Sequence, residues 1–311
     1  MGRRWLIVKS VLAAAIVAGV GWQFAKILAQ PEMAQANFAV EWPWLLPAGL
    51  LYLMAHTLWG TFWWLLVRQQ GVNISWRDGV RAYFVSQFGK YVPGKVFVIG
   101  IRVGLLRGMA AWPVVVYTAT CETLTNMAAG ALIAAALFPL VQPEELAWYK
   151  WLAVGLIAAA PLGFGLLSRL FERIAKKHAG GETLRVPSPG LMLFGLGQAC
   201  VGWCLLSLSL LCVLAALAPD FATTSMFAPG LQAVAAGYVL GFIVLVSPGG
   251  LGVREALLAA MLVARFRATH EEHVAEGFAV VVALALRLVW TAFEVALAGA
   301  LIPKRRGTDA A

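Results

Sequence analysis

Residues 87–95 of the chain read QFGKYVPGK, a polar and broken stretch inside an otherwise apolar region. Two lysines, Lys90 and Lys95, flank a Pro93-Gly94 break. Proline and glycine interrupt a helix, and backbone N–H and C=O groups left unpaired in hydrocarbon cost several kcal/mol each. We therefore predict that this stretch lines a cavity or is packed inside protein.

A second broken stretch lies in the other half of the chain, where residues 246–255 read VSPGGLGVRE. Its proline and glycines end one helical segment, and Arg254 and Glu255 open the next. Interrupted segments at corresponding places in two halves mark the midplane binding sites of many transporters. The two stretches together therefore predict one binding site between the halves.

The composition is that of a membrane protein. Of the 311 residues, 61% are hydrophobic and only 13% are charged. Apolar stretches of about 20 residues recur, which is the length that crosses a bilayer as a helix. The formal net charge of +9 lies mainly at helix ends, as in membrane topology, and does not indicate a nucleic-acid partner. The sequence predicts an all-α integral membrane protein with no sizeable soluble domain.

Hydropathy and the excess of Lys and Arg in cytoplasmic loops predict the topology. Six transmembrane helices are expected near residues 5–28, 44–67, 112–138, 148–167, 189–217 and 277–302. The first could instead be a secretory signal peptide, but its apolar run is long for one, which favours a retained helix. Both termini are expected in the cytoplasm of a bacterium, with the protein in the inner membrane.

Two re-entrant helical hairpins complete the prediction, near residues 78–107 and 230–264. The first is basic at both ends, with Arg77 and Arg81 before it and Arg102 and Arg107 in its second arm. A hairpin that enters and leaves on the cytoplasmic side satisfies the charge rule at both ends.

The second hairpin enters from the opposite face. The chain is then a single membrane domain, residues 1–311, built as an inverted-topology repeat of about 5–138 and 148–302. Tyr83 and Tyr238 each precede a Pro-Gly pair by ten residues, which agrees with a repeat.

The chemistry around the two breaks suits an anion. Lys90, Lys95 and Arg254 are cationic, and free N–H groups at a helix start attract phosphate. The predicted headgroup-binding residues are Gln87, Lys90, Tyr91, Pro93, Gly94, Lys95, Ser247, Pro248, Gly249, Gly250, Arg254 and Glu255. The alternative is that the lysines extend to the cytoplasmic surface, and that Arg254 and Glu255 pair within a tight turn.

Ionisable residues inside the predicted spans form a second candidate group. Glu122 and Asn126 share one helix face, and Arg287 and Glu294 share a face of the last helix. Such residues are usually paired and functional, so we predict a role in gating or internal pairing, with Glu122–Arg287 as one candidate pair. The alternative is a purely structural link between helices.

No metal or cofactor is predicted. His270 and His273 fit a polar loop better than a metal site, and no Walker loop, HExxH motif or nucleophile elbow is present.

In its two broken motifs the chain resembles the flippase-like transmembrane family, whose best-known member is the membrane domain of bacterial lysylphosphatidylglycerol synthase. The resemblance implies a lipid-handling membrane domain that moves a phospholipid or polyprenyl-linked headgroup between leaflets. The chain stops nine residues after Ile302, so the aminoacyl-transfer domain of the full synthase is not expected here, nor is lysyl transfer.

The expected function is therefore that of a non-enzymatic lipid transporter, which moves an anionic phospholipid or a polyprenyl-phosphate-linked headgroup across the cytoplasmic membrane. Membrane lipids are the expected partners. Two alternatives stay open, a membrane glycosyl- or phosphotransferase with a lipid-linked donor and a non-transporting scaffold of a lipid-synthesis complex. Formation of a homo-oligomer and association with lipid-synthesis enzymes stay open as well.

Overall fold

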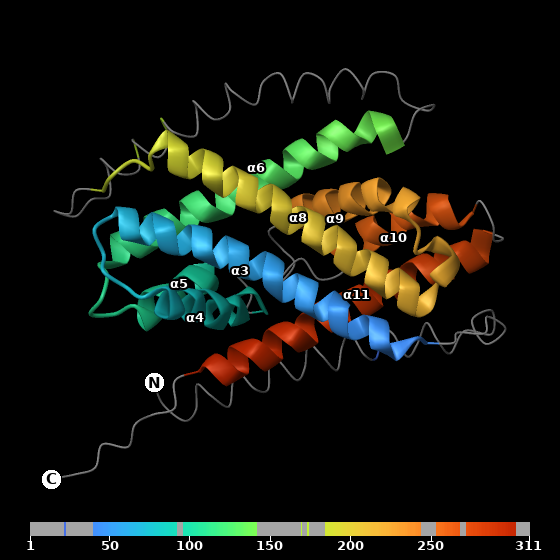
Figure 1. Ribbon diagram of the computed structural model, residues 1–311, viewed down its shortest axis with the longest axis horizontal. Coiled ribbons are helices and arrows are strands. Elements are labelled where there is room, and N and C mark those ends of the chain that lie inside the picture. The colour runs from blue at the N-terminus through green and yellow to red at the C-terminus, as the bar shows by residue number, and fades with distance from the viewer. Residues whose placement is uncertain are drawn as a thin grey trace, which may run out of the picture.

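The protein is helical wherever its structure is described (Figure 1). The computed structural model describes residues 40–91, 96–141, 184–243, 253–267 and 272–302, together with the single positions Trp22, Arg169 and Arg173. The predicted spans near residues 5–28 and 148–167 lie outside this part of the chain. So do residues 92–95 and 244–252, which contain both Pro-Gly breaks.

The helices fall into long and short ones. The long helices are α3 (Leu45–Gln69), α6 (Trp112–Val141), α8 (Pro189–Leu217), α9 (Phe227–Ile243) and α11 (Glu272–Leu301). The short α-helices are α4 (Trp76–Ser86), α5 (Val96–Leu105) and α10 (Val253–Phe266). Short 3-10 turns join them: η1 (Trp42–Trp44), η2 (Gln87–Tyr91), η3 (Pro219–Phe221) and η4 (Thr224–Met226).

Within the described residues, 5 helical segments are long and apolar enough to cross a membrane: Trp42–Gln69, Trp112–Phe138, Pro189–Leu217, Thr224–Phe242 and Val274–Leu301. Four of them coincide with predicted spans, which confirms a multi-pass helical membrane protein. The fifth contains α9, which the sequence analysis assigned to the second hairpin.

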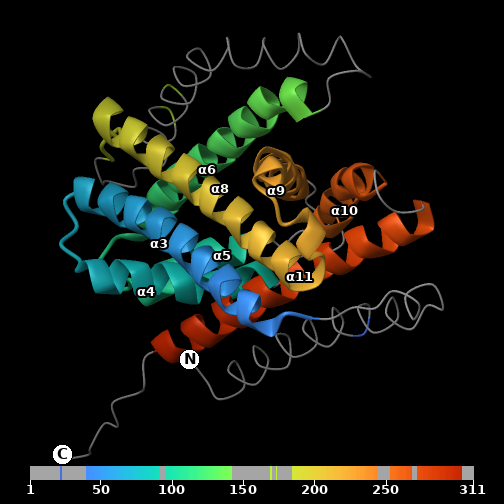
Figure 2. The ribbon, with the colours of Figure 1, turned by 45° about the vertical axis from the view of Figure 1, so that its right-hand side comes forward.

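Helices α3 and α8 run side by side in opposite directions and form the middle of the bundle (Figures 1 and 2). Small residues allow them to approach closely. A Cβ added at Gly195 or Gly202 of α8 would overlap Phe62 or Trp59 of α3, respectively. Apolar helices in lipid associate through such close packing, because burial alone gives them no hydrophobic gain. These two glycines therefore fix the contact between the halves of the chain.

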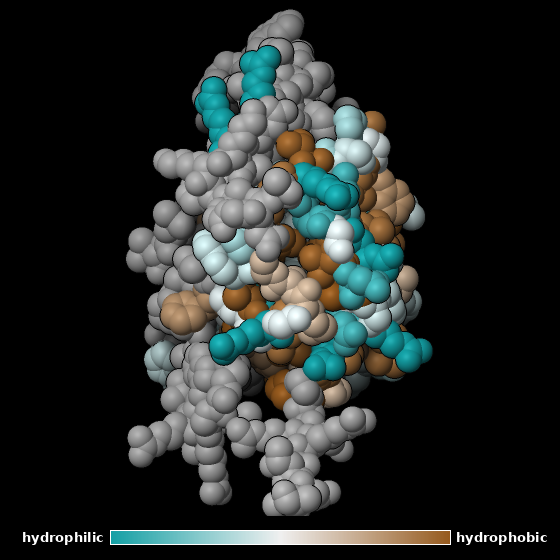
Figure 3. All heavy atoms as spheres, turned by 90° about the vertical axis from the view of Figure 1, so that its left-hand side faces the viewer, coloured by the Kyte–Doolittle hydropathy of each residue, from teal (hydrophilic) through white to brown (hydrophobic). Residues whose placement is uncertain are grey.

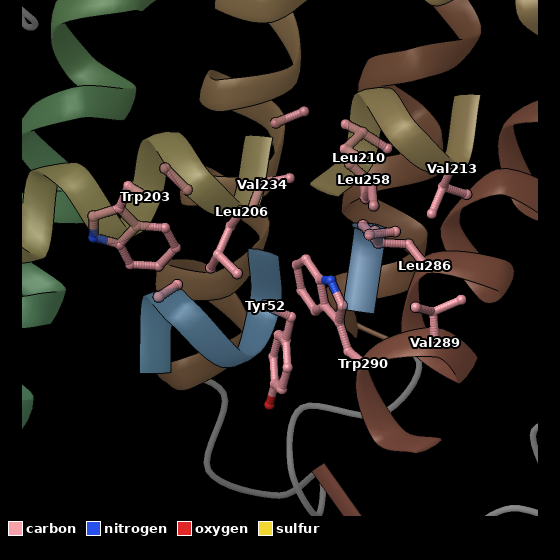
Figure 4. Packing of buried hydrophobic residues seen from close by; sticks show 14 of the residues in the cluster. Tyr52, Trp203, Leu206, Leu210, Val213, Val234, Leu258, Leu286, Val289 and Trp290 are labelled. Atoms are coloured by element: carbon pink, nitrogen blue, oxygen red, sulfur yellow. The ribbon is translucent and has the colours of Figure 1, made fainter. Parts of the chain in front are cut away.

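A layer of buried apolar side chains joins α3, α8, α9, α10 and α11 (Figure 4). Trp290 of α11 stacks on Tyr52 of α3, with ring centroids 5.2 Å apart, and donates its indole N–H to Ser209 of α8 at 2.8 Å. The Tyr52 hydroxyl points out of this layer, away from the aliphatic side chains. Tyr52 thus links the apolar core to a polar region beside it.

Helices α4 and α5 form a short hairpin that starts and ends at one end of the molecule (Figure 1). Ser75 caps α4 by accepting the N–H of Asp78 at 3.1 Å. The arms have 11 and 10 residues, about half the 20 that a span requires. Gly71 and Gly108, with φ of 86° and 84°, turn the chain into and out of the hairpin.

Exposed arginines gather at the end where α3 and α5 finish and α4 and α8 begin. They are Arg68, Arg77, Arg107 and Arg185. Figure 3 looks onto this end, where hydrophilic side chains cluster. At the opposite end of α3, Glu41 lies beside the end of α8, where its N–H donates to Ala216 at 2.9 Å. The described part of the chain therefore has a basic end, as the topology prediction requires of a cytoplasmic side.

Candidate functional site

A cavity of about 330 Å³ is bordered by the α4–α5 hairpin and by helices α9 and α10. Its lining comes from α3, α4, η2, α5, α6, α9 and α10, so both halves of the chain contribute. The lining residues are His56, Trp59, Tyr83, Gln87, Lys90, Val98, Ile99, Arg102, Ala119, Thr120, Glu122, Thr123, Leu124, Asn126, Met127, Tyr238, Phe242 and Arg254. Five of the predicted site residues are among them: Gln87, Lys90, Glu122, Asn126 and Arg254.

Lys90 reaches from η2 to the last helix. Its ammonium donates to the Glu294 carboxylate of α11, and the Tyr52 hydroxyl donates to the same carboxylate oxygen. Lys90 also lies 3.3 Å from the Tyr52 hydroxyl. Glu294 is fully buried, so Lys90 and Tyr52 supply the partners that a buried carboxylate needs. The positive charge of Lys90 is therefore neutralised within the protein.

Arg102 of α5 is the second cation at the cavity. Its guanidinium donates to Glu122 of α6 at 3.1 Å and to Ser86 at 3.0 Å. Asn126 donates to the other oxygen of Glu122 at 2.6 Å, which confirms that these two residues share a face. Arg102 was predicted as one of the basic residues at the end of the hairpin, and it does lie in the last turn of α5, but its side chain turns inward. Its side chain is only 2% exposed, because Glu122 offers an internal partner.

The predicted Glu122–Arg287 pair is also wrong. Glu122 pairs with Arg102, whereas Arg287 of α11 lies 3.5 Å from Glu255 of α10. On the same face of α11, Thr291 lies 3.5 Å from the Tyr91 hydroxyl of η2. Glu122 and Arg287 thus each pair with a residue of a short helix, α5 or α10, and not with each other.

Arg254, the first charged residue of α10, has a different environment. Its guanidinium carbon lies 3.5 Å from the centroid of the Tyr238 ring, the distance of a stacked cation–π contact. Its Nε and Nη1 atoms are buried and have no hydrogen-bond partner in the described part of the chain. Of the lysine and arginine residues that line the cavity, Lys90 pairs with Glu294 and Arg102 with Glu122, whereas Arg254 has no carboxylate partner among the described residues. Among the described residues the cavity therefore retains an uncompensated positive charge.

The two tyrosines whose spacing suggested a repeat have similar surroundings. Tyr83 and Tyr238 both line the cavity, and each ring packs against an arginine, Arg102 of α5 or Arg254 of α10. The Arg102 guanidinium carbon is 4.5 Å from the Tyr83 ring centroid, compared with 3.5 Å for Arg254 and Tyr238. The sequence echo thus corresponds to a structural one at the cavity.

Sequence reasoning missed most of the aromatic wall of the cavity. His56 and Trp59 of α3 line it, with ring centroids 4.9 Å apart, and Tyr83 lies next to His56 at 6.4 Å. His56 is the one ionisable residue of predicted span 44–67, and that isolation in an apolar helix was the available indication.

The remaining predicted residues divide into two groups. Tyr91, Glu255, Arg287 and Glu294 belong to the ion-pair network beside the cavity. Those that lie outside the described residues are Pro93, Gly94, Lys95, Ser247, Pro248, Gly249 and Gly250. The described residues include no cluster of His, Cys, Asp and Glu that could hold a metal ion.

Comparison with known families matches residues 10–298 to the family described as the lysylphosphatidylglycerol synthase TM region. This match covers both hairpins and every element that lines the cavity. Comparison with curated proteins gives no match to the chain. The chain belongs to the family of lysylphosphatidylglycerol synthase transmembrane regions, as its two broken motifs predicted.

Proposed function

We propose that this protein moves an anionic lipid headgroup across the membrane by binding its phosphate in the cavity between the hairpins. The observation that carries the proposal is Arg254, whose guanidinium faces the cavity with two buried nitrogens and without a carboxylate partner in the described part of the chain. A buried charge without a partner is costly, and a phosphate that accepts from its N–H groups would remove that cost. Membership in a lipid-related family supports the same substrate class.

The size and surroundings of the cavity suit a headgroup rather than a whole lipid. A volume of about 330 Å³ is at the lower end of ligand pockets, which run from about 300 to 1,000 Å³. The lining combines ion pairs with aromatic rings, whereas the outer faces of α3 and α8 carry exposed apolar residues such as Leu50, Met54 and Val201. The acyl chains would therefore stay in the bilayer while the headgroup passes through protein.

In this proposal the two hairpins are re-entrant and enter from opposite faces. The short arms of the first hairpin and its return to the basic end support that arrangement. The paired positions of Tyr83 and Tyr238 support an inverted repeat with six spans. With the basic end in the cytoplasm of a bacterium, both termini would be cytoplasmic and the protein would lie in the inner membrane.

The ion pairs are the proposed gates. Lys90–Glu294, Arg102–Glu122 and Arg287–Glu255 each link a hairpin residue to a long helix, α6 or α11. A phosphate that enters beside these cations competes with the carboxylates for the same N–H groups. Exchange of partners would free a hairpin to move relative to the long helices, which couples binding to opening.

Reconstitution of the purified protein in liposomes tests the proposal. The liposomes carry a trace of phosphatidylglycerol labelled on its acyl chain with a fluorophore that externally added dithionite bleaches. We expect bleaching to continue beyond the outer-leaflet pool when the protein is present, with or without an imposed proton gradient. Bleaching that stops at the level of protein-free liposomes under every gradient would contradict transport.

The same vesicles separate the two alternatives. A transferase would change the mass of a lipid-linked sugar or phosphate donor, so mass spectrometry of the extracted lipids detects it. A scaffold would leave both the leaflet distribution and the lipid masses unchanged. Transport without a change in lipid mass is the result that we expect.

The packing of Arg254 against α9 yields a prediction for an uncharged residue, Gly241. A methyl group at Gly241 of α9 would overlap the aliphatic stem of Arg254 and push its guanidinium off Tyr238. We expect Gly241→Ala to lower the initial translocation rate by about tenfold, as expected if a charge-assisted hydrogen bond of about 1.5 kcal/mol is lost. The dithionite assay measures this rate.

Gly299→Ala is the matched control, because Gly299 is also helical and has no neighbour within 4 Å of an added Cβ. Its rate should equal that of the unmodified protein. Equal rates for the two variants would show that the position of Arg254 does not matter.

A further inference from the structure

His56 is a buried polar group that the proposed function leaves without a role. It belongs to α3, is 1% exposed and lines the cavity that also contains Arg254. Its ring lies among aromatic neighbours, with the Tyr52 centroid 4.1 Å away and the Trp59 centroid 4.9 Å away. The imidazole therefore packs against aromatic rings and also borders the cavity.

The hydrogen bond of one ring nitrogen determines the role of the other. His56 Nδ1 lies 3.2 Å from the backbone carbonyl oxygen of Tyr52. A carbonyl oxygen can only accept, so Nδ1 carries the proton and donates. Since a charged ring is costly in a buried membrane segment, the neutral form is favoured, and in that form Nε2 is an acceptor.

No described residue donates to this acceptor. Nδ1 of His56 bonds to the Tyr52 carbonyl and the ring packs against aromatic side chains, and none of these contacts supplies a proton to Nε2. The nearby Glu294 carboxylate is already bonded to Lys90 and Tyr52 and has no proton to give when ionised. Nε2 is not one of the buried side-chain atoms that lack a partner, so it opens onto the cavity, where water or a ligand group can donate to it.

We propose that His56 selects the headgroup by accepting a hydrogen bond from a hydroxyl or ammonium group on the lipid whose phosphate binds Arg254. This inference rests on the proposed function for the position of the phosphate. It narrows the substrate class to phosphodiester lipids whose headgroup carries a donor. Lipids with the same phosphate but a methyl or trimethylammonium terminus would leave Nε2 unsatisfied, and a site built around a hydrogen bond rejects such analogues.

Two pairs of short-chain lipids test the proposal without changing the phosphate. Phosphatidylglycerol and phosphatidylmethanol are both monoanionic, and only the first has headgroup hydroxyls. Phosphatidylethanolamine and phosphatidylcholine are both zwitterionic, and only the first has N–H donors. Calorimetric titration of the purified protein in detergent measures the Kd of each, so every comparison isolates the donor.

We expect the unmodified protein to bind the donor lipid of each pair about three- to tenfold more tightly, the range of one net hydrogen bond. His56→Phe keeps an aromatic ring of similar size and should remove this preference while leaving the Kd for phosphatidylmethanol unchanged. His56→Gln, whose amide oxygen can replace Nε2, should retain part of the preference. Thr57→Val, the next residue on α3 and outside the cavity lining, should retain all of it.

Equal Kd values for the two members of each pair in the unmodified protein would overturn the proposal, and so would a preference that survives in His56→Phe. Absence of binding by all four lipids would overturn it as well. The outcomes for transport are separate. If binding shows a His56-dependent preference but liposomes show no translocation, the role of His56 in headgroup selection stands and the proposed transport function fails. If the protein translocates lipid but binds the members of each pair equally, the transport function stands and the role of His56 fails.

Discussion

Arg254→Ala is expected to lower headgroup translocation by about 10- to 100-fold, the range for loss of hydrogen bonds to a charged group. The guanidinium is the one cavity-lining cation that has no carboxylate partner in the described part of the chain. Its removal therefore takes away the charge that attracts phosphate. The rate of dithionite bleaching in liposomes measures the loss.

The same change should leave the protein folded. Truncation at Arg254 leaves no described carboxylate without a partner, and it removes only the stacking on Tyr238, which is worth about 2 kcal/mol at most for a desolvated pair. Arg254→Lys should transport at an intermediate rate, because lysine keeps the charge but cannot grip two phosphate oxygens with a planar fork. Rates in Arg254→Ala that equal those of the unmodified protein would remove the phosphate-binding role.

Lys90→Met is expected to destabilise the protein by about 3–5 kcal/mol, the cost of breaking a buried ion pair from one side. Lys90 is the partner of Glu294, which is fully buried, so its loss leaves a carboxylate with only the Tyr52 hydroxyl. The ion pair therefore gives Lys90 a part in stability as well as a place at the cavity. Thermal unfolding in detergent measures the effect.

A double variant separates pairing from packing. Lys90→Met with Glu294→Gln removes both charges, keeps an acceptor for Tyr52 and should recover most of the lost stability. Arg81→Met is the control for a partly exposed ion pair, because Arg81 lies 3.9 Å from Asp78 at the basic end and should cost less than about 1 kcal/mol. A single Lys90→Met variant as stable as the unmodified protein would show that the pair does not form.

The sequence predicted the long helices well, because a span needs about 20 apolar residues and hydropathy measures that directly. Spans expected at 112–138 and 189–217 agree with the helical segments Trp112–Phe138 and Pro189–Leu217. Relations within one helix were also predictable. Glu122 and Asn126, four residues apart, are hydrogen-bonded as helical periodicity requires.

Relations between helices were not predictable in the same way. Periodicity tells which residues share a face but not which helix packs against that face. Glu122 was therefore given Arg287 as a partner, whereas the α4–α5 hairpin brings Arg102 to it. Arg102 was read as part of the charge pattern that sets membrane topology. The sequence alone does not distinguish a buried, paired arginine from one exposed to the cytoplasm.

The aromatic residues that line the cavity could not be predicted from the sequence for a related reason. Helix α3 contains many aromatic residues, a composition that is typical of belts at the membrane interface. The structure buries several of them instead, including Trp59 and Phe62, because Gly202 and Gly195 of α8 leave room for these side chains of α3. Tyr52 reaches Glu294 of α11 only because of tertiary contacts, which a linear sequence does not show.

A structure of the protein in lipid nanodiscs, with a bound antibody fragment as a marker for cryo-electron microscopy, tests the central claim most directly. The proposal predicts lipid density in the cavity, with phosphate oxygens about 2.7–2.9 Å from the guanidinium nitrogens of Arg254. A cavity without headgroup density, or an Arg254 guanidinium that is bonded to a protein carboxylate, would contradict it.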